Sequence, residues 1–206
     1  MKLELVPVFE LEYFHPKIKA PSHPYTTNEY DHYLDKLYKM SGFPDKLTPI
    51  AQGYNLYSVE EISEENLIKI IKDSLLSKKE NLPGGYALCE IDQVRKPILT
   101  HRCCSDFNDI DSWLNLANKN RQGFWIGHPM LTCEIRDNQI RFIEEENEGL
   151  KDIIISFADY QIAIQHLTEK LAFIRNRIQF IAKNHQLNPK KVNQFIQFTL
   201  KNHSPI

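Results

Sequence analysis

The sequence predicts an α+β fold in which an antiparallel sheet packs against several helices, within a single domain spanning residues 1–206. Three observations predict it. Apolar and polar residues alternate on both sides of Asp137-Asn138, the pattern of an antiparallel hairpin with a two-residue turn. Elsewhere, apolar residues recur at spacings of three and four, the pattern of helices with one buried face. The chain of 206 residues has the length of one domain, and no linker is long enough to separate two.

The N-terminal part predicts a strand followed by a helix. Residues 3–14 partly alternate between apolar and polar, which favours an extended strand, and Pro7 favours an edge position for it. After a proline-rich connection, Thr26-Thr27-Asn28-Glu29 has the pattern of a capping box. We expect a helix from there to about Met40, with its apolar face formed by Tyr30, Tyr33, Leu34, Leu37 and Tyr38.

Two further helices and a strand are predicted in the middle of the chain. Ser63 starts a helix with Glu64 and Glu65 in its first turn, and its buried face is Leu67, Ile70, Ile71 and Leu75. A turn at residues 83–85 leads into a strand that ends near Ile91. Asp106 is the expected N-cap of the next helix, whose inward face is Ile110, Trp113, Leu114 and Ala117.

The hairpin around Asp137-Asn138 predicts its own register. With a two-residue turn, position 135 faces 140 and position 133 faces 142, so the apolar residues of both strands share one face. These residues are Leu131, Cys133 and Ile135 on the first strand, and Ile140 and Phe142 on the second. A third antiparallel strand is expected from the alternation of Ile153, Ile155 and Phe157.

A long C-terminal helix followed by a short one closes the predicted fold. Between residues 159 and 183, apolar residues are spaced alternately four and three apart: Tyr160, Ile164, Leu167, Leu171, Ile174, Ile178 and Ile181. This spacing also suits a dimeric coiled coil. Because Phe173 and Phe180 broaden the stripe, we expect it to pack on the chain's own sheet. Asn188-Pro189 starts the short helix, with face Val192, Phe195, Ile196 and Leu200.

The composition predicts a soluble cytoplasmic protein. Acidic residues interrupt the apolar run at positions 1–10, which argues against a signal peptide. No stretch of about 18 uncharged apolar residues is present, so no membrane span is expected. The four cysteines are expected to be reduced thiols. With 7 glycines, the chain has little material for phosphate-binding loops.

Charge is distributed unevenly along the chain. Residues 160–206 contain seven basic residues and one acid, a surplus of six positive charges. Because the net charge is −2, the remaining 159 residues carry a surplus of eight negative charges. An acidic body with a basic tail indicates what kind of partner the protein attracts and says nothing about its fold.

The tract at residues 101–106, with His128 further on, raises the question of catalysis. A cysteine enzyme would use Cys103 or Cys104 as its nucleophile. His101 or His128 would act as the base, and Asp106 would orient it. An acid at a helix start would work against the depressed thiol pKa that such an enzyme needs, however. We therefore expect no catalytic residues here, and expect both cysteines to be small buried apolar groups.

The same residues do not have the spacing of a standard zinc site. Structural zinc sites show paired cysteines two to four residues apart, whereas Cys103 and Cys104 are adjacent and no second pair exists. The gap from His101 to Cys103 is also too short. The common nucleotide-binding, metalloprotease and serine-hydrolase motifs are absent. The sequence therefore predicts no metal ion and no cofactor.

The basic C-terminus permits a nucleic-acid interpretation. Residues 189–200 would be the recognition helix of a helix-turn-helix motif, and the turn before it has about the right length. That turn lacks the glycine such motifs often contain. Lys190, Lys191 and Lys201 suit the solvated back of a packed helix equally well, so nucleic-acid binding stays an alternative.

Acidic residues form the candidate partner-binding surface. They fall into two groups, and we expect a negative rim near a hairpin tip: Glu60, Glu61, Glu64 and Glu65, then Glu144, Glu145, Glu146 and Glu148. Such a rim is either an ordinary solvated loop or a surface that steers and grips a basic partner protein.

Residues 103–110, together with Trp113 and residues 125–129, resemble a group of bacterial proteins that act as immunity partners of secreted antibacterial toxins. The resemblance covers about a sixth of the chain. It implies a protein-binding inhibitor that blocks the active site of a cognate toxin, often a nuclease, whose basic cleft would suit an acidic body. A nucleic-acid-binding regulator using residues 160–206, and an enzyme using Cys104 and His128, are the alternatives.

Overall fold

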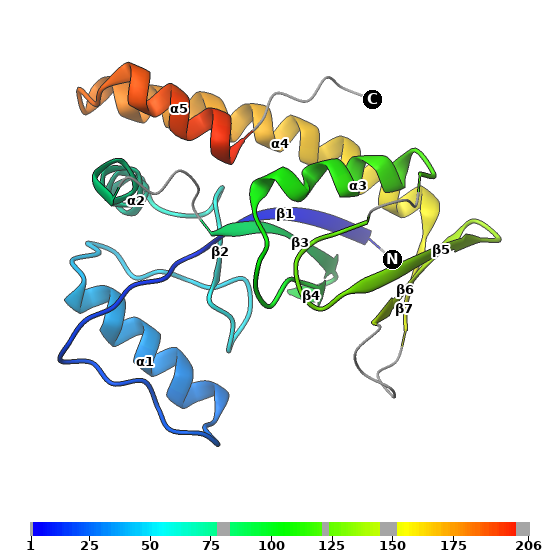
Figure 1. Ribbon diagram of the computed structural model, residues 1–206, viewed down its shortest axis with the longest axis horizontal. Coiled ribbons are helices and arrows are strands. Elements are labelled where there is room, and N and C mark those ends of the chain that lie inside the picture. Colours follow the sequence, from blue (N-terminus) through cyan, green and yellow to red (C-terminus); the bar gives the residue numbers. More distant parts are fainter. Residues whose placement is uncertain (1, 78–82, 121–123, 145–151, 201–206) are drawn as a thin grey trace.

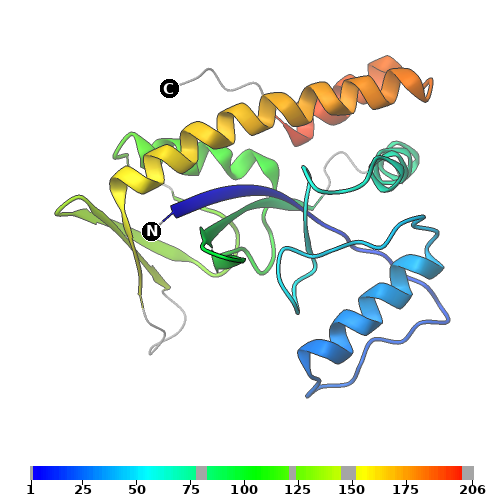
Figure 2. The same ribbon diagram turned by 180° about the vertical axis from the view of Figure 1, so that it is seen from behind.

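The computed structural model describes residues 2–77, 83–120, 124–144 and 152–200. It confirms the α+β fold, with the strands arranged in two antiparallel sheets. Helices α3 (Ile110–Ala117), α4 (Phe157–Asn184) and α5 (Pro189–Thr199) lie on one side of the first sheet, and α1 (Thr27–Met40) lies on the other side (Figure 1). The second sheet projects from the end of the molecule where α4 begins, as the view from behind also shows (Figure 2).

The first sheet has the strand order β2-β1-β3-β4, and all of its pairs are antiparallel. Its strands are β1 (Lys2–Glu10), β2 (Leu56–Ser58), β3 (Gly84–Ile91) and β4 (Arg95–Leu99). The predicted strands near the N-terminus and before Ile91 are present. Strands β2 and β4 differ from the prediction, which has no strand at either place, because both are short and neither shows a clear alternation of apolar and polar residues.

The expected edge position of the first strand is wrong, since β1 lies between β2 and β3. Pro7 is tolerated in this inner strand because its backbone nitrogen and carbonyl face β2 and not β3. Its carbonyl accepts a hydrogen bond from the Val59 amide at 3.0 Å, so its ring nitrogen faces the β2 side. The last β1–β2 pair is Val8 with Ser58, one residue away. The missing N–H therefore costs no hydrogen bond to β3.

The second sheet has the order β5-β6-β7 and confirms the predicted hairpin register. Its strands are β5 (Leu131–Arg136), β6 (Gln139–Glu144) and β7 (Ile153–Ser156). Ile135 pairs with Ile140, and Cys133 pairs with Phe142. The turn residues Asp137 and Asn138 have φ angles of 47° and 61°, the left-handed values that a tight hairpin turn needs.

Helices α1, α2 (Glu64–Ser77) and α5 begin where capping residues predict, whereas α4 begins at Phe157, which the sequence placed in the third strand of the hairpin sheet. Thr26 and Glu29 form the expected capping box, and Asn188 caps the last helix, with proline in its first turn. Asp106 caps a short 3₁₀ turn that leads into the third helix, and this turn puts Leu116 in the core while Leu114 is half-buried. The helical elements are α1 (Thr27–Met40), α2 (Glu64–Ser77), η1 (Phe107–Asp109), α3 (Ile110–Ala117), α4 (Phe157–Asn184) and α5 (Pro189–Thr199).

Helix α4 organises the core. All seven residues of its predicted apolar stripe, from Tyr160 to Ile181, are buried, and the helix packs along β1. At its start, the Tyr160 hydroxyl donates a hydrogen bond of 2.7 Å to the carbonyl of Trp113, which is itself fully buried. This contact joins α4 to α3 inside the core.

The outward side of α4 differs from the prediction. Phe173 is 56% exposed and Phe180 is 62% exposed, so they do not widen the stripe that packs on the sheet. The sheet and α3 cover one face of α4 and α5 covers a second, which leaves these aromatic residues facing away from the molecule. Helix α5 folds back alongside α4 as a helical hairpin (Figures 1 and 2). A helix-turn-helix motif instead crosses its two helices at a steep angle.

A half-buried polar network ties α4 to the first sheet. The Lys170 ammonium bridges the carboxylates of Glu4 on β1 and Glu60 after β2, the latter at 2.8 Å. Burial alone would raise the pKa of Glu4, but hydrogen bonds and charges from Lys170 and Arg95 outweigh it and hold the pKa below its ordinary value. Two turns further on, the Arg177 guanidinium donates to the backbone carbonyls of Glu60 and Ile62, at 2.9 and 2.5 Å.

Among the residues that the structure describes, no helix has both the length and the apolar content needed to cross a membrane.

We predict that Tyr160→Phe lowers the free energy of unfolding by about 1–2 kcal/mol, because it removes the buried hydrogen bond to the Trp113 carbonyl and changes little else. Urea unfolding followed by circular dichroism measures this. Tyr33→Phe is the matched control at a half-buried position of α1, and it should change stability by less than about 0.5 kcal/mol. If both substitutions lower stability equally, the buried hydrogen bond from Tyr160 to the Trp113 carbonyl does not contribute the stability assigned to it.

We predict that Lys170→Met destabilises the protein by about 1–3 kcal/mol at pH 7, because Glu4 and Glu60 lose their charged partner. The folded state lowers the pKa of Glu4, so the stabilisation is present above its ordinary value of 4.5 and is lost as pH falls through the lower folded value. The difference between wild type and variant should therefore shrink below about pH 4. Lys183→Met, exposed on the same helix, is the control.

Candidate functional site

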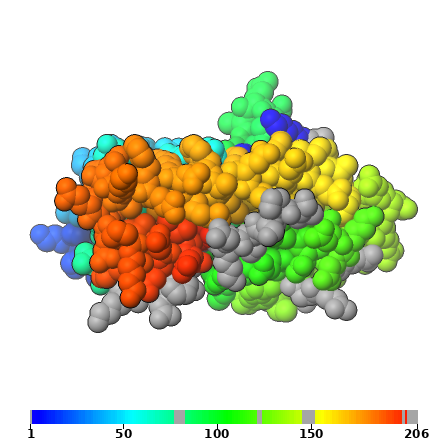
Figure 3. Space-filling view, turned by 90° about the horizontal axis from the view of Figure 1, so that it is seen from above, coloured from blue at the N-terminus to red at the C-terminus, as the bar shows by residue number. Residues whose placement is uncertain are grey.

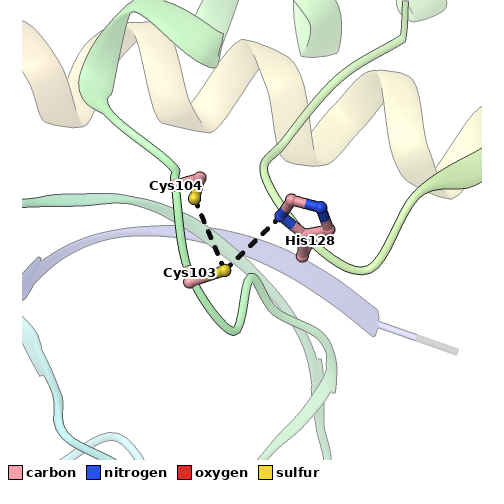
Figure 4. Close-up of side chains that lie close together, drawn as sticks. All are labelled: Cys103, Cys104 and His128. Atoms are coloured by element: carbon pink, nitrogen blue, oxygen red, sulfur yellow. Dashed lines mark hydrogen bonds between the residues drawn. The ribbon is translucent and has the colours of Figure 1, made fainter.

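Three metal-ligating side chains come together on two neighbouring loops. Cys103 and Cys104 lie between β4 and η1, and His128 lies between α3 and β5 (Figure 4). The Cys103 sulfur is 3.4 Å from His128 Nδ1 and 3.5 Å from the Cys104 sulfur. The three ligand atoms all lie within 4.8 Å of one another. Residues 25 positions apart in the sequence thus form one compact cluster.

The backbone holds the two loops in register. Cys103 and His128 form an isolated antiparallel bridge, in which the His128 amide donates to the Cys103 carbonyl at 3.0 Å. The Arg102 amide donates in turn to the His128 carbonyl at 2.6 Å. These two bonds make a minimal sheet, and a pair in such a ladder carries its side chains on the same face. The thiol of Cys103 and the imidazole of His128 therefore face each other.

Two unusual backbone conformations shape the loops. Gly127 has φ +86°, and a Cβ there would lie 2.3 Å from the Cys103 carbonyl oxygen, so glycine is required for the close approach. Cys104 has φ 62°, which is rare for a residue with a side chain. This left-handed turn brings the second thiol back beside the first.

The prediction that these cysteines are buried is wrong, because both are exposed. The residues that follow them enter the core instead: Ser105 is 8% exposed and Phe107 is 2% exposed. The loop anchors itself through those two side chains and through the cap at Asp106, which leaves the thiols on the solvent side. Cys89 and Cys133 are buried, each with a pKa raised to about 12 by desolvation.

The thiol–imidazole contact is short enough for a cysteine nucleophile and its base. However, the pKa of Cys103 is raised, first by its hydrogen bond with Cys104, then by partial desolvation and the charges of Cys104 and Glu10. A raised pKa favours the thiol over the reactive thiolate. The Asp106 carboxylate accepts hydrogen bonds from the Asn108 amide and side chain, at 2.6 and 3.1 Å, and these bonds occupy it as a helix cap.

His101 does not join the cluster. Its side chain is 1% exposed, and its Nε2 atom lies 3.6 Å from a carboxylate oxygen of Glu10 on β1. It packs beside Gly85 of β3, where a Cβ would lie 3.5 Å from His101 Nδ1 and 2.4 Å from the Ser105 hydroxyl. His101 thus belongs to the packing beneath the loop, and His128 supplies the imidazole of the site.

The acidic residues of the predicted rim lie in separate places. Glu64 and Glu65 are on α2, whereas Glu144 ends β6, and these elements lie at opposite ends of the molecule (Figures 1 and 2). Several are paired within the chain: Glu60 with Lys170, Glu61 with Arg95, Glu64 with His185 and Glu144 with Arg102. Glu65 is exposed. Glu145, Glu146 and Glu148 lie outside the described residues.

Comparison of the chain with protein-family models, curated proteins and solved structures gives no match.

We predict that Gly127→Ala lowers the free energy of unfolding by about 1–3 kcal/mol more than Gly42→Ala does. Gly42 is the matched control, because its φ of +84° imposes the same left-handed strain while nothing lies closer than 4.0 Å to its added Cβ. Only Gly127→Ala also pushes a methyl group into the Cys103 carbonyl. Chemical unfolding of both variants measures the difference, and equal losses would contradict the required close approach.

Proposed function

We propose that this chain binds another protein as an inhibitor of the immunity type, with a cognate antibacterial toxin as its partner. One observation carries the proposal: a row of large apolar side chains on the outer face of α4. Ile162 is 51% exposed, Phe173 is 56% exposed and Phe180 is 62% exposed. We call these three residues the outer row. Exposed apolar groups that line up on one element indicate a surface covered by a partner.

The helical geometry of α4 aligns the outer row. Phe173 and Phe180 follow Ile162 by 11 and 18 residues, and at 3.6 residues per turn all three point within about 20° of one direction. The row extends about 27 Å along the helix. Seen from above, α4 runs across the surface of the molecule, and no other helix or strand covers it in this view (Figure 3). A surface of this length matches the reach of a protein interface.

A groove beside α4 gives the proposed binding surface a recess as well as an exposed apolar row. It has a volume of about 540 Å³, and it is lined by Ala117 of α3 and by residues of α4 that include Gln161, Gln165 and Ala172. Partner side chains that anchor in such a recess carry a large share of binding energy in protein complexes. Exposed aromatic residues without a neighbouring recess would contribute less binding energy.

The chemistry of the outer row favours a protein over a nucleic acid. Duplex binding depends on Lys and Arg side chains that contact phosphates. Between Ile162 and Phe180, the outward positions of α4 instead include His166, Glu169 and Asn176. The negative surplus of residues 1–159 would steer a basic toxin toward the chain and speed association. The resemblance of residues 103–110, Trp113 and residues 125–129 to bacterial immunity proteins supports the same partner class.

We predict that a double substitution, Phe173→Glu with Phe180→Glu, weakens binding to the toxin at least about 100-fold, because two exposed aromatic anchors are replaced by charges. The toxin to be used is the product of the gene that adjoins this chain's own gene. Calorimetry measures the affinity, and survival of cells that express both proteins measures protection. Wild-type association should also slow as salt concentration rises.

The matched control is Phe14→Glu, which alters a side chain that is 86% exposed but belongs to the connection between β1 and α1. It should leave affinity and protection unchanged. The proposal is wrong if the adjoining gene product is harmless, if the chain does not bind it, or if the α4 variant protects as well as the wild type. A low-salt gel shift that retards DNA would favour the nucleic-acid alternative.

A further inference from the structure

We propose that Cys103, Cys104 and His128 form a binding site for a soft divalent metal ion of the zinc class, with one coordination position left open to solvent. This site is independent of the outer row on α4. The sequence by itself predicts no metal, because adjacent cysteines lack the usual spacing of zinc ligands. The fold adds a third ligand, because His128 lies on a different loop that pairs with the loop of the two cysteines (Figure 4).

The distances between the donors fit a tetrahedral ion. Zinc binds thiolate sulfur at about 2.3 Å and imidazole nitrogen at about 2.0–2.1 Å. Around one tetrahedral ion, those bond lengths put two sulfurs about 3.8 Å apart and a sulfur and a nitrogen about 3.5 Å apart. Cys103 is 3.5 Å from the Cys104 sulfur and 3.4 Å from His128 Nδ1. The third pair, the Cys104 sulfur and the His128 imidazole, lies within 4.8 Å, so it needs to approach by at most about 1.3 Å.

The site is held in shape by the protein before any ion binds. The Cys103–His128 bridge fixes two donors on one face, and the left-handed turn at Cys104 fixes the third. The indole of Trp125 packs edge-on to the imidazole, with ring centroids 5.6 Å apart, while its backbone amide donates to the Ser112 hydroxyl on α3 at 3.1 Å. Ligands whose orientation is set in advance lose less entropy on binding.

The donor set selects the kind of ion. Thiolate and imidazole ligands prefer zinc and similar borderline or soft ions, whereas magnesium and calcium prefer oxygen ligands. On binding, each thiol releases its S–H proton to solvent and the sulfur lone pair forms the metal–sulfur bond. The imidazole donates the lone pair of Nδ1, and no electrons are transferred between centres. Two thiolates neutralise the charge of a divalent ion.

Three protein donors leave one tetrahedral position free. Within the described ranges 2–77, 83–120, 124–144 and 152–200, no other His, Cys, Asp or Glu groups with these three as a ligand. Both cysteines are exposed, so water or an exchangeable ligand can reach the ion. Closed structural zinc sites use four protein ligands, and three ligands plus water are typical of sites that exchange or activate the fourth ligand. The ion would also clamp together the two loops that connect the sheets.

The test uses the purified full chain, freed of metal with a chelator and kept reduced. Cobalt(II) serves as the probe, because tetrahedral cobalt–thiolate sites give intense visible bands and a sulfur-to-cobalt charge-transfer band. We expect one cobalt per chain with this spectrum, displacement of cobalt by zinc, and release of about two protons per ion. Zinc at about one hundred times its dissociation constant should raise the melting temperature by about 5–10 °C.

Substitutions assign the ligands. Cys103→Ser, Cys104→Ser and His128→Asn should each lower affinity at least about 100-fold, since loss of even an outer partner of a metal ligand costs 10–100-fold. His32→Asn, at an exposed position of α1, should bind cobalt as the wild type does. Circular dichroism without metal establishes that each variant is folded, and three separate variants keep the test open if one is not. A spectrum of octahedral cobalt, or tight binding that survives all three substitutions, would overturn the proposal.

Discussion

The burial of one face of α4 is the constraint on which the rest of the structure depends. The helix starts directly after β7, so it is covalently joined to the second sheet, and it then packs along β1 of the first. Tyr160 attaches it to α3, and Lys170 with Arg177 attaches it to β1 and to the segment before α2. Apolar burial supplies the non-directional attraction, and these polar contacts restrict where along the sheet the helix can sit.

The two proposed sites have different physical origins. The outer row exists because the sheet, α3 and α5 cover the other sides of α4, and the side that remains carries aromatic residues. The thiol–imidazole cluster exists because the chain must pass from the first sheet to the second through two loops that pair with each other. One site would work by excluding water from an apolar surface, and the other by donating lone pairs to an ion. Either can therefore be correct without the other.

Local patterns predicted most of the elements but not how they are arranged. Thr26 with Glu29, Asn188 with Pro189, and the turn at Asp137-Asn138 act within a few residues, so their effects can be read from the sequence. Short strands such as β2 and β4 carry too few residues for a period to emerge, and the inner position of β1 depends on partners far along the chain. For the candidate site, the sequence identified Cys103, Cys104 and His128 as notable residues but indicated burial and no metal. It did not single out the outer row.

The sequence by itself determined the α+β class, the hairpin register and the buried stripe of α4, because each follows from periodicity and from capping between near neighbours. Tertiary structure decided which further residues of α4 stay uncovered and which histidine meets the thiols. The reason is that exposure and long-range proximity depend on which distant segments cover a residue. Phe173 has the chemistry of a core residue, yet nothing packs over most of its side chain; His101 is two residues from Cys103, yet His128 is its neighbour in space.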